Sequence, residues 1–257
     1  MSEKDKNAKS AGPDRLTEIL KLWASRYSQP IEHLSADRLV SLIEKFLSEK
    51  PGGKKKGRKA GRRWDHEVIK EIITPGARVL DLGCGSGELL ERLIRLKGVR
   101  GQGIEIDPEK VYECVGRGVS VFQADLDQGL PGWPDNSFDF VILEETLQTV
   151  HEPVKVLSEM IRVGKRGIIS FPNFGYWRVR LELGLGGKMP VIESLPYPWY
   201  QTPNIHLCSL EDFMAWAREA RVEIIDSHVL SEGEVRPLRE DDNLFAEEVL
   251  FVVQGNH

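Results

Sequence analysis

The 257-residue sequence predicts an α/β fold, in which a mostly parallel β-sheet carries helices on both faces. Two observations lead to this prediction. From Trp64 onward, apolar runs typical of buried strands alternate with amphipathic runs at helical spacing. A glycine-rich turn, Gly83-Cys84-Gly85-Ser86-Gly87, joins the first strand to the helix that follows it. Alternation of this kind is the pattern of parallel sheets covered by crossover helices.

The first strand, residues 79–82, runs directly into the glycine turn, and a helix over 88–97 follows. Glycine has no Cβ, so the backbone can take a positive φ and a ligand can approach the main chain closely. The helix N-terminus adds unpaired N–H groups at the same place. Asp81, at the strand end, can accept a hydrogen bond or balance a cation. We therefore expect a ligand against this turn.

The second strand, residues 103–106, ends in acid. Glu105 lies 22 residues after Gly83, the distance at which a nucleotide-binding βαβ unit places a carboxylate on the ribose hydroxyls. The turn reads G-x-G-x-G and differs from the G-x-G-x-x-G that fits a pyrophosphate. This spacing favours a nucleoside without phosphates over a dinucleotide.

The rest of the chain continues the alternation. Further strands are expected over residues 119–123, 140–143, 167–171, 222–230 and 244–253. Further helices are expected from Trp64 to Ile73 and over 108–117, 153–163 and 210–220. Residues 172–208 are irregular but too aromatic for disorder, so we expect a lid over the strand ends with a short helix over 179–185.

The sequence predicts three parts. Residues 1–50 form an N-terminal extension with a polar, disordered start and two short amphipathic helices. Residues 51–63 form a basic, glycine-containing linker without acidic residues. Residues 64–257 form the ligand-binding domain.

Composition excludes several function classes. The net charge is −5, which gives no overall basic footprint for nucleic acid. The three cysteines, Cys84, Cys114 and Cys208, have the spacing of neither a zinc site nor a disulfide framework, so no metal site is expected. The N-terminus lacks the apolar region of a signal peptide, and no apolar run reaches the ~18 residues of a membrane span. We therefore expect a cytoplasmic protein that does not bind membranes.

The residues Arg78 to Glu88 resemble motif I of the class I S-adenosylmethionine-dependent methyltransferases. Gln123-Ala124-Asp125-Leu126 resembles the segment of that superfamily that meets the adenine. The resemblance implies a Rossmann-like fold with a seven-stranded sheet closed by an antiparallel edge pair. It implies S-adenosylmethionine or S-adenosylhomocysteine as ligand, bound by Asp81, Gly83, Cys84, Gly85, Gly87, Glu105, Ile106, Asp125, Leu126 and Glu144.

Three longer motifs are similar to a narrower family, the MetW proteins of methionine biosynthesis. They are E-E-T-L-Q at 144–148, R-V-G-K-R-G-I-I-S-F-P-N-F-G-Y-W-R-V-R at 162–180, and L-P-Y-P-W-Y-Q-T-P-N-I-H-L-C at 195–208. The resemblance implies a role beside a homoserine O-acyltransferase, as its partner. It says nothing about the first 63 residues, and no methyl acceptor follows from the motifs.

Four side chains are the candidates for a catalytic base: Glu144, His151, Tyr176 and His206. Glu144 and Glu145 follow a strand, where adjacent side chains face opposite ways, so at most one should point into the site. His151 is expected to cap the helix that begins at Pro153, and His206 to make a structural hydrogen bond. Cys84 lies between two glycines, where packing is the favoured role over nucleophilic work.

Two functional classes remain open. In one, the protein binds S-adenosylmethionine and acts on the acyltransferase. In the other, it is a methyltransferase with an unidentified small or macromolecular acceptor. The position after the fourth strand reads Leu143-Glu144-Glu145-Thr146 and lacks the Asn-Pro-Pro-Tyr of amide and base methylases. This difference and the family resemblance favour the first class.

Overall fold

A computed structural model describes residues 41–45, 48 and 63–255. The chain divides into two compact units, Met1–Lys55 and Lys56–His257. In the first unit, residues 41–45 and 48 are helical. The expected disordered start, the helix before Pro30 and residues 51–62 of the expected basic linker lie outside the described residues.

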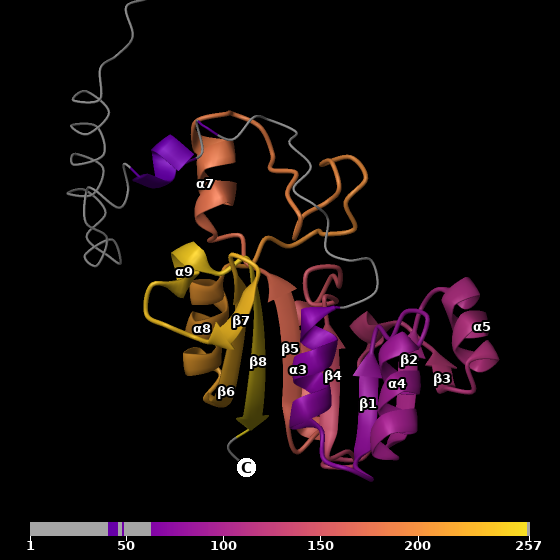
Figure 1. The fold of residues 1–257 in the computed structure, drawn as a ribbon. Coiled ribbons are helices and arrows are strands. Elements are labelled where there is room, and N and C mark those ends of the chain that lie inside the picture. The colour runs from indigo at the N-terminus through magenta and orange to yellow at the C-terminus, as the bar shows by residue number, and fades with distance from the viewer. Residues whose placement is uncertain (1–40, 46–47, 49–62, 256–257) are drawn as a thin grey trace, which may run out of the picture. The chain divides into compact units, whose positions relative to one another are not determined.

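The second unit is built on one eight-stranded sheet with the strand order β3-β2-β1-β4-β5-β8-β6-β7 (Figure 1). The first five strands in the chain pair in parallel, whereas β8, β6 and β7 run antiparallel to their neighbours. The strands are β1 (Arg78–Leu82), β2 (Arg100–Glu105), β3 (Ser120–Gln123), β4 (Phe140–Glu144), β5 (Gly167–Pro172), β6 (Val222–Ser231), β7 (Glu234–Pro237) and β8 (Glu248–Gly255).

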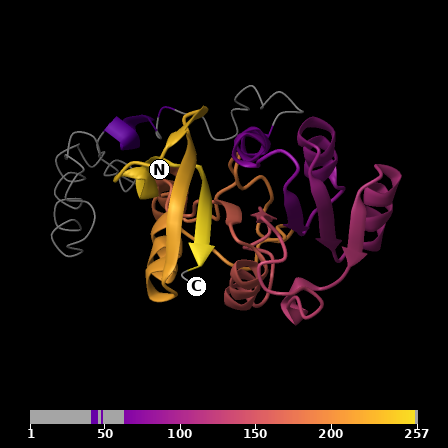
Figure 2. The same cartoon turned by 90° about the horizontal axis from the view of Figure 1, so that it is seen from below.

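Helices cover both faces of this sheet, as the alternation predicted (Figure 2). One core cluster joins the sheet to α3 (Trp64–Ile72), α4 (Glu88–Lys97) and Cys114 of α5 (Pro108–Gly116). The other joins the opposite face to the 3-10 turn η1 (Leu126–Gln128), α6 (Pro153–Val163) and α8 (Leu210–Glu219). Two short helices, α7 (Trp177–Gly184) and α9 (Asp242–Phe245), lie in the connections.

Local signals set several helix ends. The Asp107 side chain caps α5 by accepting from the backbone N–H of Glu109, and Pro108 occupies the first turn. Ser209 and Asp212 form a reciprocal capping box at the start of α8. No helix among the described residues combines the length and apolar character that crossing a membrane requires.

The sheet has one strand more than the seven expected. The additional strand, β7, pairs with β6 through a hairpin in which Ser231 faces Glu234. Its two loop residues, Glu232 and Gly233, both have positive φ values, 52° and 83°. A two-residue turn of this kind matches the twist of an antiparallel pair and returns the chain onto β6.

The expected lid lies beyond the carboxyl ends of the parallel strands (Figure 1). The amide of Asn173, whose side chain is buried, fixes both of its ends. Its Oδ1 accepts from the backbone N–H groups of Gly175 at 2.9 Å and Leu210 at 3.0 Å. Its Nδ2 donates to the carbonyl of Ala246 at 2.9 Å. The lid therefore starts and ends at one buried hub beside β5 and β8.

Candidate functional site

The glycine loop after β1 contains one position at which the backbone faces open space. Gly85 has a φ of 54°, and a Cβ added there would meet no atom within 4 Å. Gly83 differs, because an added Cβ would lie 2.6 Å from Oγ1 of Thr146 in the loop after β4. Gly83 is thus required for packing between two loops, and Gly85 leaves bare backbone facing open space.

Glu105, at the end of β2, is bound to this loop. Its Oε2 accepts from the backbone N–H of Gly85 at 2.8 Å. Its Oε1 accepts from the N–H groups of Ile106 at 2.8 Å and Asp107 at 2.9 Å. An ionised carboxylate has about four lone-pair positions, so these three bonds leave capacity for a ligand hydroxyl.

The expected adenine segment lies at the ends of β2 and β3. Ile106 is 62% exposed, whereas Leu126 is buried. Asp125 caps the turn η1, and its Oδ1 accepts from the N–H of Asp127 at 2.9 Å. An exposed apolar side chain beside an acid is a surface that suits a flat heterocycle with an exocyclic amine.

The first turn of α3 brings a charged cluster to the end of β4, and we call it the α3–β4 cluster: Arg63, Asp65, His66, Glu144 and Glu145. Nη2 of Arg63 lies 2.9 Å from Asp65, 2.8 Å from Glu144 and 3.0 Å from Glu145. Nε2 of His66 lies 2.9 Å from Oε1 of Glu144. The indole of Trp64 donates to Glu248 on β8 and anchors this end of the helix.

Strand alternation predicted that Glu144 and Glu145 face opposite ways, and here the structure differs; that at most one of them points into the ligand site stays a prediction. Both carboxylates contact the guanidinium of Arg63. The physical reason is the backbone at Glu145, whose φ is 46°. Strand alternation ends at Glu144, and a residue in the left-handed region turns the next side chain back to the same side.

Burial changes the protonation of this region. Burial raises the pKa of Asp81 to about 7. It also raises the pKa of Glu144 well above its ordinary value, with the neighbouring Asp65 as the second cause. Burial opposes the charge of Asp65, but the hydrogen bond with Glu144 and the charge of Arg63 hold its pKa below the ordinary value. The pKa of His66 is lowered, mainly by burial, so its ring is neutral.

Donor atoms of Asp65, His66 and Glu144 lie within 4.8 Å of one another, a spacing that metal sites also show. Here the guanidinium of Arg63 contacts two of the three side chains and supplies the positive charge. We therefore interpret the group as an ion-pair cluster, in which the arginine guanidinium supplies the positive charge that a bound metal ion would otherwise supply.

The other catalytic candidates have different surroundings. Tyr176 is buried, packs edge-on against Trp177 with ring centroids 5.5 Å apart, and has a pKa raised mainly by burial. His206 is exposed, and its backbone N–H donates to the carbonyl of Gln148 at 3.1 Å. His151 was expected to cap α6, but that helix has no side-chain cap. Instead, Asp127 accepts from the N–H groups of His151 and Glu152.

Cys84 is packed inside the glycine loop. Its Sγ lies 3.8 Å from Sγ of Cys114, and burial raises the pKa of both thiols. The Sγ of Cys114 donates to the carbonyl of Gly85 at 3.1 Å, and Gly87 forms the N-cap of α4. Buried thiols with raised pKa values are poor nucleophiles, in agreement with a packing role.

Sequence reasoning missed four contributors: Arg63, Asp65, His66 and Gln148. Arg63 was assigned to the basic linker because of the lysines and arginines before it. Gln148 joins the loop after β4 to the lid: its carbonyl accepts from the N–H groups of Ile205 at 2.9 Å and His206 at 3.1 Å. Its side-chain amide donates to the carbonyl of Glu145 at 2.9 Å. The one available signal was its place in the E-E-T-L-Q motif.

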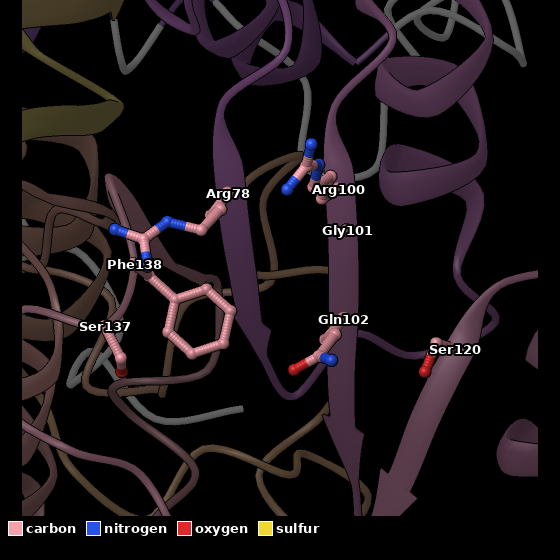
Figure 3. A pocket seen from close by; sticks show the side chains of 7 residues that line it. All are labelled: Arg78, Arg100, Gly101, Gln102, Ser120, Ser137 and Phe138. Atoms are coloured by element: carbon pink, nitrogen blue, oxygen red, sulfur yellow. The ribbon is translucent and has the colours of Figure 1, made fainter.

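A cavity of about 300 Å³ lies at the opposite end of the parallel strands (Figure 3). Its lining includes Arg78 at the start of β1, Arg100 and Gln102 on β2, Ser120 at the start of β3, and Phe138. These positions are amino ends of strands, so the cavity is separate from the glycine loop and Glu105.

Comparison with known proteins agrees with this geometry. Residues 63–253 match the family model "Methionine biosynthesis protein MetW". The chain is 37% identical over 188 residues to a bifunctional methionine biosynthesis protein MetXA/MetW of Rhodopirellula baltica, covering 70% of this chain and 30% of that relative. It thus spans about a third of that relative's length. It is also 25% identical over 194 residues to a demethylmenaquinone methyltransferase of Bacillus licheniformis, covering 68% of this chain and 83% of the relative.

Solved structures show the same fold. One is a S-adenosylmethionine-dependent methyltransferase, a possible histamine N-methyltransferase, of Thermotoga maritima, with a TM-score of 0.55 at 18% identity, covering 84% of this chain and 96% of that one. Another is a TehB-like methyltransferase of Corynebacterium glutamicum, with a TM-score of 0.53 at 15% identity, covering 86% and 97%. The domain therefore has the Rossmann-like fold of class I methyltransferases.

Proposed function

The chain belongs to the MetW family of methionine biosynthesis proteins, and we propose that it binds S-adenosylmethionine at the carboxyl ends of β1, β2 and β4 and acts on a homoserine O-acyltransferase. The cofactor's role in this proposal is that of a signal, since it is made from the methionine that such an acyltransferase helps to produce. The partner is suggested by the MetXA part of the fused relative.

The residues present fit the nucleoside part of that ligand. Gly85 leaves open space against the backbone, and Glu105 beside it keeps acceptor capacity for ribose hydroxyls. Ile106 and Asp125 supply an apolar side chain and an acceptor at the next two strand ends. Asp81 lies in β1 next to its last residue and Glu144 ends β4, and in this proposal the two carboxyl groups receive the cationic methionine part of the ligand.

One observation carries the regulatory part of the proposal: the loop after β4 touches both the glycine loop and the lid. Thr146 of this loop packs against Gly83, and its Oγ1 donates to the carbonyl of Glu144 at 2.9 Å. Two residues further on, the carbonyl of Gln148 holds the lid backbone at Ile205 and His206. A ligand that orders the glycine loop therefore also affects the lid, through the three consecutive residues 146–148.

The lid also presents the kind of surface that a protein partner requires. Five of its exposed apolar side chains lie between residues 197 and 207, and we call them the lid strip: Tyr197, Trp199, Tyr200, Ile205 and Leu207. Trp199 is 73% exposed and Tyr200 68%, and their rings pack edge-on with centroids 5.6 Å apart. Aromatic side chains are enriched at interfaces, and exposed apolar groups gathered on one segment mark interaction sites. We assign the lid strip to the acyltransferase.

Co-purification tests the proposal. The tagged chain should capture the homoserine O-acyltransferase of the same organism from native lysate, and the amount captured should change when S-adenosylmethionine is added. The activity of the purified acyltransferase should also change when the chain is added. Capture that is independent of the ligand would contradict a signalling role, and a lack of capture in both conditions would contradict the partnership.

A second function is supported by the similarity to demethylmenaquinone methyltransferases along most of their length. In this alternative, the chain transfers the methyl group to an acceptor under the lid. Incubation of cell extract with methyl-labelled S-adenosylmethionine distinguishes the two functions. Label that appears in an extract fraction only with the wild-type chain, and disappears with Gly85→Val, would favour the enzyme.

A further inference from the structure

We propose that this site selects its ligand by positive charge. The buried carboxyl groups of Asp81 and Glu144 make the site bind S-adenosylmethionine, a methylsulfonium, more tightly than S-adenosylhomocysteine, a neutral thioether. The inference rests on the proposed function and deepens it. A protein that reports the end product of a pathway gains from ignoring the demethylated form, which has the same adenosine and amino-acid groups.

Asp81 and Glu144 lie on the same face of the sheet. Asp81 pairs in register with Ile142 of β4, and Glu144 follows Ile142 by two residues, so all three side chains face the same side. Val79 and Ile142 belong to the core cluster under α3 and α4, which identifies that face. Asp81 is 2% exposed, and the Glu144 side chain is 9% exposed. Both therefore lie on the face of the sheet under α3 and α4, with almost no access to water.

The groups that face these two carboxyls carry excess negative charge. Arg63 and Asp65 act on Glu144, and Arg63 and Glu105 act on Asp81. Glu145 contacts the same guanidinium, and Glu88 and Arg92 of α4 act on His66. The thiols of Cys84 and Cys114 have raised pKa values and are neutral, as is His66. Besides Asp81 and Glu144 themselves, these described groups comprise four carboxyls and two guanidiniums, and Arg92 is already paired with Glu67.

One buried polar atom in the α3–β4 cluster lacks hydrogen bonds of good geometry. Oε1 of Glu144 is buried and makes no hydrogen bond of good geometry, although Arg63 and His66 lie close to it. Burial of a carboxylate is costly unless a cation or donor compensates it, and otherwise the group retains its proton. A bound cation can replace that proton. The sulfonium of the ligand supplies a permanent positive charge, and the thioether supplies none.

The expected size of the preference follows from Coulomb's law. One unit charge at about 8 Å from a second, at an effective dielectric constant of about 20, changes an affinity about 30-fold. Both Asp81 and Glu144 contribute, but part of the gain goes into displacing a proton from carboxyls whose pKa values are raised, so we expect a preference of about this order.

Isothermal titration calorimetry of the full chain with three ligands tests the inference. S-Adenosylmethionine and S-adenosylhomocysteine differ in the sulfonium charge. Sinefungin carries an amino-bearing carbon in place of the methylsulfonium and so restores a positive charge without a sulfonium. The full set is repeated with Glu144→Gln and Asp81→Asn. Glu211→Gln on α8 is the control, because it removes one exposed carboxylate from a pair with Arg218.

We expect both cationic ligands to bind about 30-fold more tightly than S-adenosylhomocysteine, and each site variant to lower this ratio while the control leaves it unchanged. Equal affinities for wild type, or tighter binding of S-adenosylhomocysteine, would overturn charge selection and leave the proposed function intact. Absence of binding by all three ligands would overturn the proposed function itself. An unchanged ratio in both folded variants would remove these two residues from the selection. If a variant fails to fold, the wild-type comparison decides.

Discussion

The backbone N–H of Gly85 donates a 2.8 Å hydrogen bond to Oε2 of Glu105, and this bond joins the glycine loop after β1 to the end of β2. It holds a stretch of glycine backbone next to an acidic side chain that can accept a further hydrogen bond. The ligand proposed for this protein needs both features in one place, because its ribose carries hydroxyls and its sulfonium-bearing arm must pass close to the main chain.

Gly85→Val should abolish binding of S-adenosylmethionine. A β-branched side chain would fill the open space beside Gly85 and would resist its φ of 54°. Gly76→Val is a matched control, since Gly76 has a φ of 73° and also has no atom within 4 Å of an added Cβ, but lies in the turn before β1. Calorimetry on both folded variants checks the prediction, and retained affinity in Gly85→Val would contradict the site.

Glu105→Ala should weaken binding by ~1.5–3 kcal/mol, the usual worth of hydrogen bonds to a charged group. Glu109→Ala is the control, because Glu109 is an exposed carboxylate in the first turn of α5. The dissociation constants of the two variants are compared with wild type. If Glu105→Ala and Glu109→Ala bind alike, Glu105 takes no part in ligand binding.

Asp81→Asn should stabilise the ligand-free protein above neutral pH. The pKa of Asp81 is raised to about 7 in the folded chain, mainly by burial, against 3.8 ordinarily. Its contribution to stability is therefore fully present below pH ~4 and is lost as the pH rises through ~7. The asparagine cannot ionise, so the variant should gain about 4 kcal/mol over wild type at pH ~8, the equivalent of a rise in pKa from 3.8 to about 7.

Denaturant unfolding at several pH values measures this difference. The gain should shrink as the pH falls from ~7 and vanish below pH ~4, where the wild-type carboxyl keeps its proton in the unfolded chain as well. Asp135→Asn, at a carboxylate with a 70% exposed side chain, controls for the loss of one negative charge. A difference between Asp81→Asn and wild type that does not change with pH would show that folding does not raise the pKa of Asp81.

Trp199→Ala and Tyr200→Ala should weaken capture of the acyltransferase at least about tenfold, as loss of a central aromatic anchor usually does. Ligand affinity should remain, because both side chains are exposed on the lid strip. Tyr112→Ala on α5 is the control, since that ring is 77% exposed on another element. If all three variants capture the acyltransferase equally, the partner does not dock on the lid strip, and other surfaces, including residues 1–55, become the candidates.

The sequence predicted those parts of the fold that depend on local signals. The helices Glu88–Lys97 and Pro153–Val163 begin and end at the predicted residues, because glycine and proline mark their ends. Strand β7 was missed, since it is short and depends on a hairpin turn in which Glu232 takes a positive φ. A glutamate carries no local signal for that conformation.

The candidate site likewise has one part that the sequence predicted and one part that it did not. Gly85 and Glu105 are joined in the structure, as their spacing in a βαβ unit indicated. The α3–β4 cluster could not be predicted, because Arg63 meets Glu144 only after α3 packs across the sheet. The Glu145 side chain contacts the same guanidinium because the φ of its backbone is positive. Sequence patterns could not predict that φ either.

The most direct test of the ligand site is a crystal of this protein soaked with S-adenosylmethionine. The expected result is electron density for the ligand against the backbone at Gly85, with its ribose on Glu105 and its amino-acid end toward Asp81 and Glu144. An empty crevice at Gly85, or density only in the cavity lined by Arg78 and Arg100, would contradict the proposal.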